Sequence, residues 1–286
     1  MIKDCKISGF ADEINGKFQV QLQVMKELGQ KYVEFRTADG IGVADLTIPQ
    51  ALQYKAEMEK EGVKVSAVGS PIGKIGILED FEPHFQKYCH VVELAKVFET
   101  PYIRTFSFYS PKDESIASYR EEVMKRLERM VEYAVKHNVI LLHENEKGIY
   151  GDVASRCKDL MEHFYGEHYQ CTFDFANFVQ CNQDTLEAYE MLKPYIRYIH
   201  VKDARVFDGE VVLAGDGDGN VKKIFHLLNQ QDFQGYLSLE PHLTNFLGFS
   251  SLEKDAAKRK EENGIQAYKS AYHRLEELIL ESSNIS

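Results

Sequence analysis

The sequence lacks any apolar run that approaches the ~18 residues of a membrane span, and its first residues contain no apolar signal-peptide core. We therefore expect no membrane partner. Cysteine is also scarce: the five residues are odd in number and scattered, and no C-x-x-C pair occurs. This usage argues against a disulfide framework or a zinc ribbon and predicts reduced thiols in a cytoplasmic protein.

Basic residues are fewer than acidic residues in this chain. The chain has 34 Lys and Arg residues against 45 Asp and Glu residues, which gives a formal net charge of −11. A net acidic chain repels phosphate backbones, so nucleic acid is not expected as a partner. Hydrophobic residues make up 44% and charged residues 28% of the chain, as in globular proteins with a large core.

The chain also lacks internal boundaries. It contains no linker rich in Pro, Gly or Ser, no low-complexity tract and no short repeat, which predicts that residues 1–286 form a single domain. No G-x-G-x-x-G motif follows the first expected strand, which argues against a doubly wound dinucleotide-binding sheet. A single α/β barrel of ~250 residues fits the length.

Short β-branched or aromatic runs alternate with longer amphipathic segments along the chain. The expected strands cover residues 6–10, 32–35, 63–68, 102–106, 139–143, 170–173, 195–201 and 236–239. The expected helices cover residues 18–28, 49–61, 85–98, 115–136, 152–164, 184–192 and 221–228. These units predict an α/β fold, a single (β/α)8 TIM barrel over about residues 6–243 with a C-terminal helical extension over about residues 251–280. A short hairpin is expected at about residues 205–214, followed by a tight turn at residues 216–220.

Acidic and imidazole side chains lie at the ends of four consecutive expected strands. Glu144 follows the fifth strand and Asp174 the sixth, while His200 and Glu240 end the seventh and eighth. In a (β/α)8 barrel these strand ends meet at the face that carries the active site. Carboxylates that converge there are costly to desolvate and repel one another, and a divalent cation relieves both costs. Three carboxylates and one imidazole suit Mn²⁺, Zn²⁺, Co²⁺ or Mg²⁺.

The segments around these residues are typical of a known family. They read Leu-His-Glu-Asn-Glu at 142–146, Phe-Asp-Phe-Ala-Asn-Phe at 173–178, His-Val-Lys-Asp-Ala at 200–204 and Leu-Glu-Pro-His at 239–242. Gly-Phe-Ala-Asp-Glu-Ile at 9–14 and Ser-Pro-Ile-Gly-Lys at 70–74 are typical of one branch. In order and spacing, the chain resembles the sugar phosphate isomerase/epimerase family of the xylose-isomerase-like barrel superfamily over about residues 6–243.

The resemblance implies one divalent metal ion held by Glu144, Asp174, His200 and Glu240. Mn²⁺ and Zn²⁺ are the preferred candidates, followed by Mg²⁺ and Co²⁺. It also implies that Glu144 and Glu240 flank the substrate as an acid/base pair. Glu146 competes for the position after strand five, but Glu144 is preferred because it lies nearer the strand and begins the family's Glu-Asn pair.

The chemistry implied is proton transfer next to a carbonyl group. The cation would polarise the carbonyl of a hydroxy-ketone and stabilise the enediolate formed when one Glu removes the adjacent proton. Return of the proton to the same carbon from the opposite face gives an epimer, and return to the neighbouring carbon gives an isomer. The expected substrate is a small sugar, keto-polyol or related hydroxy-ketone.

Further side chains are candidates for contact with this substrate: Lys202, Arg205, Arg104, Asn177, Glu146, Lys74 and Phe108. Strand alternation places Lys202 on the same side as His200. Arg104 lies in an apolar strand and needs a partner, either the substrate or a barrel-interior carboxylate such as Glu34. Surface charge for Lys202 and Arg205, and core packing for Phe108, are the alternatives.

The sequence also limits the expected substrate class and the set of expected metal ligands. Asn177 stands where ketohexose epimerases of the superfamily have His, and residues 147–150 lack the Glu with which they grip the sugar, so a free ketohexose is disfavoured. By alternation, His143 and His242 are expected to face away from the metal.

Other functions remain open from the sequence. A dehydratase of inosose or dehydroshikimate type is the main alternative, since it also begins by removing a proton beside a carbonyl. An abasic-site endonuclease shares the barrel, but such enzymes have metal sites rich in His, and this chain offers only His200 among its strand-end ligands. A non-catalytic sugar-binding protein is the last alternative. A homo-oligomer is possible through the C-terminal helix, which could equally cap the barrel.

Overall fold

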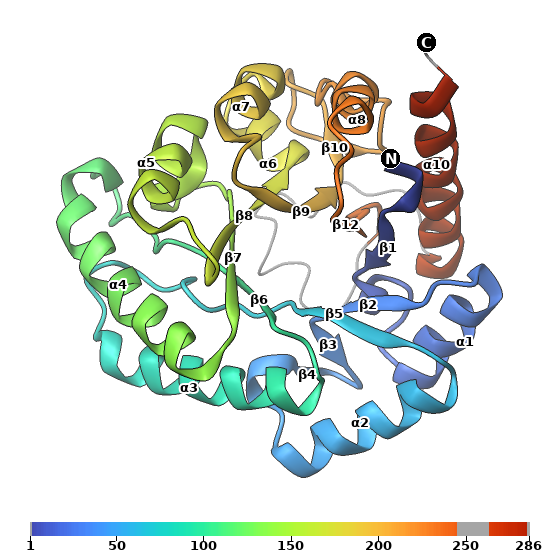
Figure 1. Cartoon of the computed structure of the whole chain (residues 1–286), viewed down its shortest axis with the longest axis horizontal. Coiled ribbons are helices and arrows are strands. Elements are labelled where there is room, and N and C mark those ends of the chain that lie inside the picture. Colours follow the sequence, from blue (N-terminus) through green and yellow to red (C-terminus); the bar gives the residue numbers. More distant parts are fainter. Residues whose placement is uncertain (1, 245–262, 285–286) are drawn as a thin grey trace.

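The computed structural model describes residues 2–244 and 263–284. Its centre is a sheet of eight strands, ordered β1-β12-β9-β8-β7-β6-β5-β2. The strands are β1 (Lys6–Gly9), β2 (Tyr32–Phe35), β5 (Lys64–Val68), β6 (Tyr102–Thr105), β7 (Ile140–Glu144), β8 (Tyr169–Asp174), β9 (Ile196–Val201) and β12 (Tyr236–Leu239). Hydrogen-bonded neighbours run parallel, and β1 and β2 lie side by side, so the barrel is nearly closed (Figure 1). The predicted (β/α)8 barrel is confirmed.

Helices form a ring around the strands (Figure 1). They are α1 (Phe18–Leu28), α2 (Ile48–Lys60), α3 (Phe81–Val97), α4 (Arg120–His137), α5 (Ala154–Phe164), α6 (Phe175–Gln180), α7 (Thr185–Leu192), α8 (Val221–Gln230) and α10 (Gly264–Asn284). Local signals account for several ends. A capping box between Thr47 and Gln50 begins α2, and Gly29 ends α1 in the left-handed conformation with a φ of 67°.

The structure shifts two predicted helix starts. Helix α3 begins at Phe81 rather than residue 85, because the Asp80 side chain accepts a hydrogen bond from the Glu82 backbone and caps the first turn. The predicted cap Ser115 makes no capping hydrogen bond, and a 3₁₀ turn at Ile116–Tyr119 precedes α4. All five cysteines are free, as predicted.

Two short hairpins interrupt the regular alternation. β3 (Thr37–Ala38) pairs with β4 (Ile41–Gly42) across an Asp39-Gly40 turn, in which both residues have positive φ, 50° and 80°. β10 (Asp203–Ala204) pairs with β11 (Val211–Val212), which confirms the expected hairpin near residues 205–214. The second hairpin follows β9 directly and so lies beside the strand ends.

The C-terminal helix α10 packs on the chain's own barrel, between α8 and α1 (Figure 1). Tyr268 in α10 contacts Gln30 through a 3.1 Å hydrogen bond, and Leu275 is fully buried. The predicted helix over 251–280 is described only from Gly264, since residues 251–262 lie outside the described residues. No described helix is long and apolar enough to cross a membrane.

The barrel interior is layered by strand alternation, and this layering positions the site. Ala67, Tyr102, Leu142 and Tyr198 form an inner apolar cluster. Two residues further along three of these strands, at their carboxyl ends, stand Arg104, Glu144 and His200, which therefore point into the same barrel mouth.

Candidate metal centre

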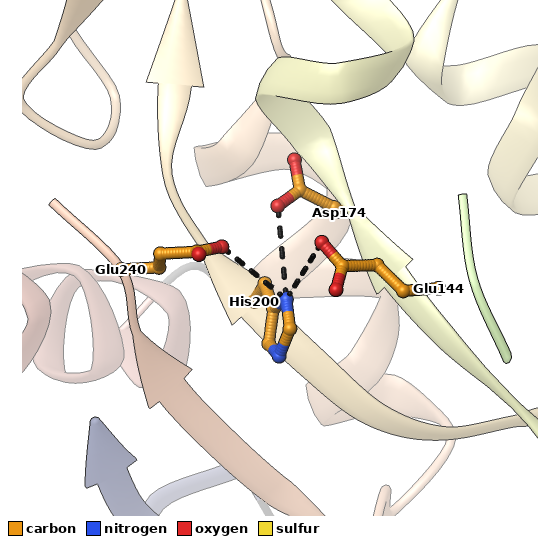
Figure 2. Close-up of side chains that lie close together, drawn as sticks. All are labelled: Glu144, Asp174, His200 and Glu240. Atoms are coloured by element: carbon orange, nitrogen blue, oxygen red, sulfur yellow. Dashed lines mark ion pairs between the residues drawn. The ribbon is translucent and has the colours of Figure 1, made fainter. Parts of the chain in front are cut away.

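Four buried side chains converge at the carboxyl ends of the last strands. Glu144 ends β7, Asp174 ends β8, His200 lies in β9 and Glu240 follows β12. The Nδ1 atom of His200 lies 3.2 Å from Glu144 Oε1, 3.8 Å from Asp174 Oδ2 and 3.4 Å from Glu240 Oε2 (Figure 2). These four ligand atoms lie within 4.8 Å of one another. We call these residues the carboxylate–histidine cluster.

The donor set fits a divalent cation. Glu144 Oε2, Asp174 Oδ2 and His200 Nδ1 are buried and have no hydrogen-bond partner in the described part of the chain. Arg104 and Lys202 form ion pairs with two of these oxygens, and a cation held between the carboxylates would further offset the cost of burying them. Oxygen and imidazole ligands together suit Mn²⁺, Zn²⁺, Mg²⁺ or Co²⁺.

The charges of the cluster are strongly coupled. Burial raises the pKa of Asp174 to about 7, although the Lys202 ammonium opposes this shift. Burial also raises the pKa of Glu144, but His200 and Arg104 outweigh it and lower that pKa to about 2. Burial lowers the pKa of His200, yet Glu144 and Glu34 raise it well above its usual value. A proton on His200 thus substitutes for part of the charge that a metal ion would bring.

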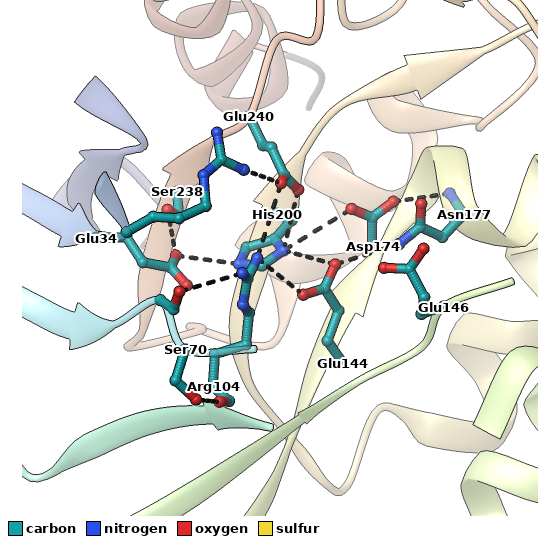
Figure 3. A network of polar contacts seen from close by, with 12 residues as sticks. Glu34, Ser70, Arg104, Glu144, Glu146, Asp174, Asn177, His200, Ser238 and Glu240 are labelled. Atoms are coloured by element: carbon teal, nitrogen blue, oxygen red, sulfur yellow. Dashed lines mark hydrogen bonds and ion pairs between the residues drawn. The ribbon is translucent and has the colours of Figure 1, made fainter. Parts of the chain in front are cut away.

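Glu34 on β2 orients the histidine ring. Its Oε2 lies 3.0 Å from His200 Nε2 and accepts a 2.7 Å hydrogen bond from the Ser238 hydroxyl (Figure 3). With Nε2 engaged in this way, Nδ1 faces the carboxylates. A carboxylate behind a metal-binding imidazole has this orienting role in metal centres.

Arg104 points into the cluster and forms a barrel-interior ion pair, with Glu144 rather than with the suggested Glu34. Its Nη1 lies 3.3 Å from Glu144 Oε2 and 3.8 Å from Glu240 Oε1, and its Nη2 donates to the Gly69 carbonyl at 3.3 Å. Glu34, the suggested partner, is instead engaged by His200 and Ser238. The partner depends on how far along each strand the charges lie, which the sequence does not show.

Lys202 joins the cluster, as its alternation with His200 predicted. Its Nζ lies 3.2 Å from Asp174 Oδ2 and 3.2 Å from Glu240 Oε2, and the residue is buried. Its carboxylate neighbours raise its pKa even though burial lowers it. A charged ammonium therefore stands beside the ligand atoms, within reach of a bound substrate oxygen.

Asn177 contacts two of the cluster residues, Asp174 and Glu144, from helix α6. This helix was not predicted. Asp174 caps this helix by accepting from the Asn177 backbone at 2.8 Å through Oδ1, which leaves Oδ2 toward the cluster. The Asn177 amide donates to Glu144 Oε1 at 3.2 Å and to the Asn145 carbonyl at 2.8 Å. A six-residue helix of four apolar and two amide residues is too short to show a helical periodicity in the sequence.

Lys74 and Glu146 pair with each other and remain partly exposed. Their side chains, 13% and 17% exposed, form a 2.9 Å ion pair, and the Lys74 ammonium lies 4.3 Å from the Phe106 ring centre. Glu146 lies near the cluster without contributing a ligand atom to it (Figure 3). The preference for Glu144 over Glu146 agrees with this geometry.

Two predicted contact residues are not brought to the cluster. Arg205 lies after the β10 strand with 40% of its side chain exposed and pairs with Glu210. Phe108 is buried in the core, where its ring contacts Phe81 at 5.7 Å and the Arg126 guanidinium at 5.3 Å. These positions match the surface and core alternatives for the two residues.

Sequence reasoning missed a further charged group behind Glu240. Arg36, the residue after β2, donates to Glu240 Oε1 at 3.0 Å, to Glu13 Oε1 at 3.2 Å and to Asp12 at 2.8 Å. Its alternation with Glu34 along the strand was the available signal. His143 does face away from the cluster, toward the Ser107 hydroxyl at 2.9 Å.

His242 lies behind Glu240 and outside the carboxylate–histidine cluster. Its Nε2 lies 3.3 Å from Glu240 Oε1 and 3.5 Å from Glu13 Oε1. Strand alternation does not set its direction, because β12 ends at Leu239 and His242 has a φ of 48°, outside the extended conformation.

The fold and the cluster together define a (β/α)8 barrel with a candidate metal centre at its carboxyl face. Residues 22–278 match the model of the xylose isomerase-like TIM barrel family, and the chain belongs to that family.

Individual relatives are distant. A 3-dehydroshikimate dehydratase of Bacillus anthracis is 23% identical over 192 residues, which cover 64% of this chain and 69% of that enzyme. The structure of an L-ribulose 3-epimerase superposes with a TM-score of 0.77 at 14% identity, covering 98% of this chain and 96% of the other. A xylose isomerase-like TIM barrel protein from Mycobacterium smegmatis, solved in complex with magnesium, superposes with a TM-score of 0.70 at 14% identity, covering 97% and 99%.

Proposed function

We propose that this chain is a divalent-metal-dependent isomerase or epimerase of a small sugar, keto-polyol or related hydroxy-ketone. The observation that carries the proposal is the placement of Glu144 and Glu240. Their carboxylates approach the Nδ1 atom of His200 from opposite sides, at 3.2 and 3.4 Å (Figure 2). Two carboxylates that flank one small site can act on the two faces of a substrate held between them.

The carboxylate–histidine cluster would hold the metal ion. When bound there, a divalent cation supplies Lewis-acid polarisation of the substrate carbonyl and stabilises the charge of an enediolate. His200 and Arg104 hold the pKa of Glu144 at about 2, and Lys202 and His242 lower the pKa of Glu240, although burial raises both. Both carboxylates are thus ionised at neutral pH, which is the form that binds a cation and the form from which a general base acts.

The remaining residues of the site would bind and orient the substrate. Arg104 and Lys202 are buried cations beside the carboxylates and would donate hydrogen bonds to substrate oxygens. Lys74 and Glu146, which pair with each other and are partly exposed, would contact the distal end of the substrate. Asn177, which replaces the His of ketohexose epimerases, donates to Glu144 at 3.2 Å and favours a substrate other than a free ketohexose.

A dehydratase is the second candidate, and one observation favours it. The relative with 23% identity is a 3-dehydroshikimate dehydratase. A dehydratase reaction on this chain would also begin with proton removal beside a carbonyl. The first step by Glu144 or Glu240 would be shared, and loss of a hydroxyl group would replace proton return.

Proton exchange in D₂O tests the shared step and separates the two outcomes. The Mn²⁺-loaded protein would be incubated with ketopentoses, ketohexoses, inososes and 3-dehydroshikimate, and followed by NMR and ultraviolet absorbance. Deuterium beside the carbonyl with a new epimer or isomer supports the proposal, whereas a conjugated product formed by loss of water supports the dehydratase.

Matched variants assign the step to the two carboxylates. Glu144→Gln and Glu240→Gln should each lower the exchange rate by ~10²–10⁴, the usual contribution of general acid/base catalysis. Glu121→Gln, at an exposed position in α4, should leave the rate unchanged. Equal rates in all four proteins would refute the assigned roles.

A further inference from the structure

A second set of potential metal ligands lies directly behind the first. Glu13, Glu240 and His242 are buried, and their ligand atoms lie within 4.8 Å of one another. Glu240 belongs to both sets through different oxygens. Its Oε2 faces His200 and Lys202, and its Oε1 faces His242 at 3.3 Å. A carboxylate placed in this way can bridge two cations.

The guanidinium group of Arg36 already occupies this second set. Its Nη1 donates to Glu240 Oε1 at 3.0 Å and its Nη2 donates to Glu13 Oε1 at 3.2 Å. These are the same two oxygens that His242 Nε2 faces, at 3.3 and 3.5 Å. The positive charge that a metal ion would bring to these carboxylates is therefore present in the chain.

Packing holds the Arg36 side chain in this place. Only 8% of it is exposed, and its Nε donates to Asp12 Oδ2 at 2.8 Å. Its guanidinium carbon lies 4.3 Å from the Phe10 ring centre, and the same ring lies 4.8 Å from the guanidinium carbon of Arg104. Phe10 thus packs against both guanidinium groups, and Arg36 cannot leave without unpairing buried carboxylates.

We infer that Arg36 is an internal cation that keeps the centre mononuclear, by occluding the second ligand set and holding the outer oxygen of Glu240. The inference rests on the proposed metal centre. Its consequence is that Glu240 offers a single oxygen, Oε2, to the carboxylate–histidine cluster. Without the guanidinium, Glu13, Glu240 and His242 would bind a second divalent ion about 4 Å from the first.

Metal stoichiometry tests this inference without reference to activity. Metal-free wild type, Arg36→Met and Arg36→Lys would be titrated with Mn²⁺ by calorimetry, and bound metal measured by elemental analysis after dialysis. We expect one ion per chain in wild type and in Arg36→Lys, which keeps the charge, and two in Arg36→Met. Electron paramagnetic resonance should show magnetic coupling between the two ions in Arg36→Met alone.

Each result separates the role of Arg36 from that of the metal centre. Wild type that binds no ion overturns the centre itself, and the inference with it. Wild type with two ions, or Arg36→Met with one, overturns only the role of Arg36, since a purely structural arginine would change stability but not stoichiometry. Arg36→Gln is the second uncharged variant if Arg36→Met does not fold, with the same two ions expected. Adding Glu13→Gln to either variant should restore one ion.

Discussion

Glu34 governs the direction in which the His200 imidazole presents its free nitrogen. The carboxylate lies 3.0 Å from Nε2 and is itself held by Ser238. Glu34→Gln keeps the size of the side chain but removes its charge. We expect Mn²⁺ affinity to fall about 10–100-fold, as for other carboxylates behind a metal-bound histidine. Titration against a competing chelator measures the change, and the exposed Glu121→Gln variant is the control.

Asp174 makes metal binding depend on pH. Burial raises its pKa from 3.8 to about 7, so in the metal-free protein this carboxyl is protonated below neutrality. A metal ion must displace the proton, and Mn²⁺ affinity should therefore fall as the pH decreases through 7. Proton release, measured by calorimetry in buffers of different ionisation enthalpy, should accompany binding. Affinity that is constant between pH 5.5 and 8, about 1.5 units below and 1 unit above that pKa, would contradict this prediction.

The same raised pKa also affects the metal-free fold. Between pH 3.8 and about 7 the folded protein holds this proton and the unfolded chain does not. The stabilising contribution of the protonated group is therefore lost as the pH rises through 7. Asp174→Asn, which cannot titrate, should flatten this part of the profile in urea unfolding of the metal-free protein.

At the scale of elements, the buried Asp203 carboxylate organises the connection from β9 to α8 through hydrogen bonds to its backbone. Asp203 accepts backbone hydrogen bonds from Gly215, Gly217 and Gly219, at 2.9, 3.1 and 2.8 Å. The expected turn at residues 216–220 thus folds back onto the residue that follows Lys202. A Cβ atom at Gly217 would lie 2.5 Å from the Ala204 carbonyl oxygen, closer than van der Waals contact allows.

Gly217→Ala should therefore destabilise the protein by about 1–3 kcal/mol, the usual cost of overpacking. Gly166→Ala is the matched control, because nothing lies within 4 Å of its added Cβ and its φ is not positive. The free energy of unfolding in urea would show the difference. Equal free energies of unfolding for the two variants would mean that the turn at residues 216–220 accommodates the added methyl group without loss of stability.

At the scale of the whole molecule, α10 completes the helical ring between α8 and α1. Leu275 on this helix is fully buried, whereas Leu280 is 63% exposed. Leu275→Ala should lower the free energy of unfolding by about 2–5 kcal/mol through loss of apolar burial and the cavity it leaves. Leu280→Ala should change it by less than about 0.5 kcal/mol. Two-state urea unfolding of both variants provides the comparison. A similar loss of unfolding free energy in the two variants would contradict the packing of α10 on the barrel through Leu275.

Local patterns in the sequence were sufficient for the strands and for most helices. Strand and helix periods depend on neighbouring residues, so β2, α1 and β12 fall at their predicted bounds. The elements that escaped prediction are those whose local signal is short or ambiguous. Helix α6 is six apolar or amide residues capped by Asp174, and the start of α3 depends on a cap at Asp80.

The convergence of Glu144, Asp174, His200 and Glu240 followed from chain order, because parallel strands of one barrel end at one face. The inward position of Lys202 followed from alternation along β9 in the same way. The pairing of charges across the barrel did not. Arg104 pairs with Glu144 rather than Glu34, and Arg36 reaches Glu240 across 204 residues of chain. Such partners depend on strand register, barrel closure and burial, which bring distant residues within a few ångströms and are properties of the folded molecule alone.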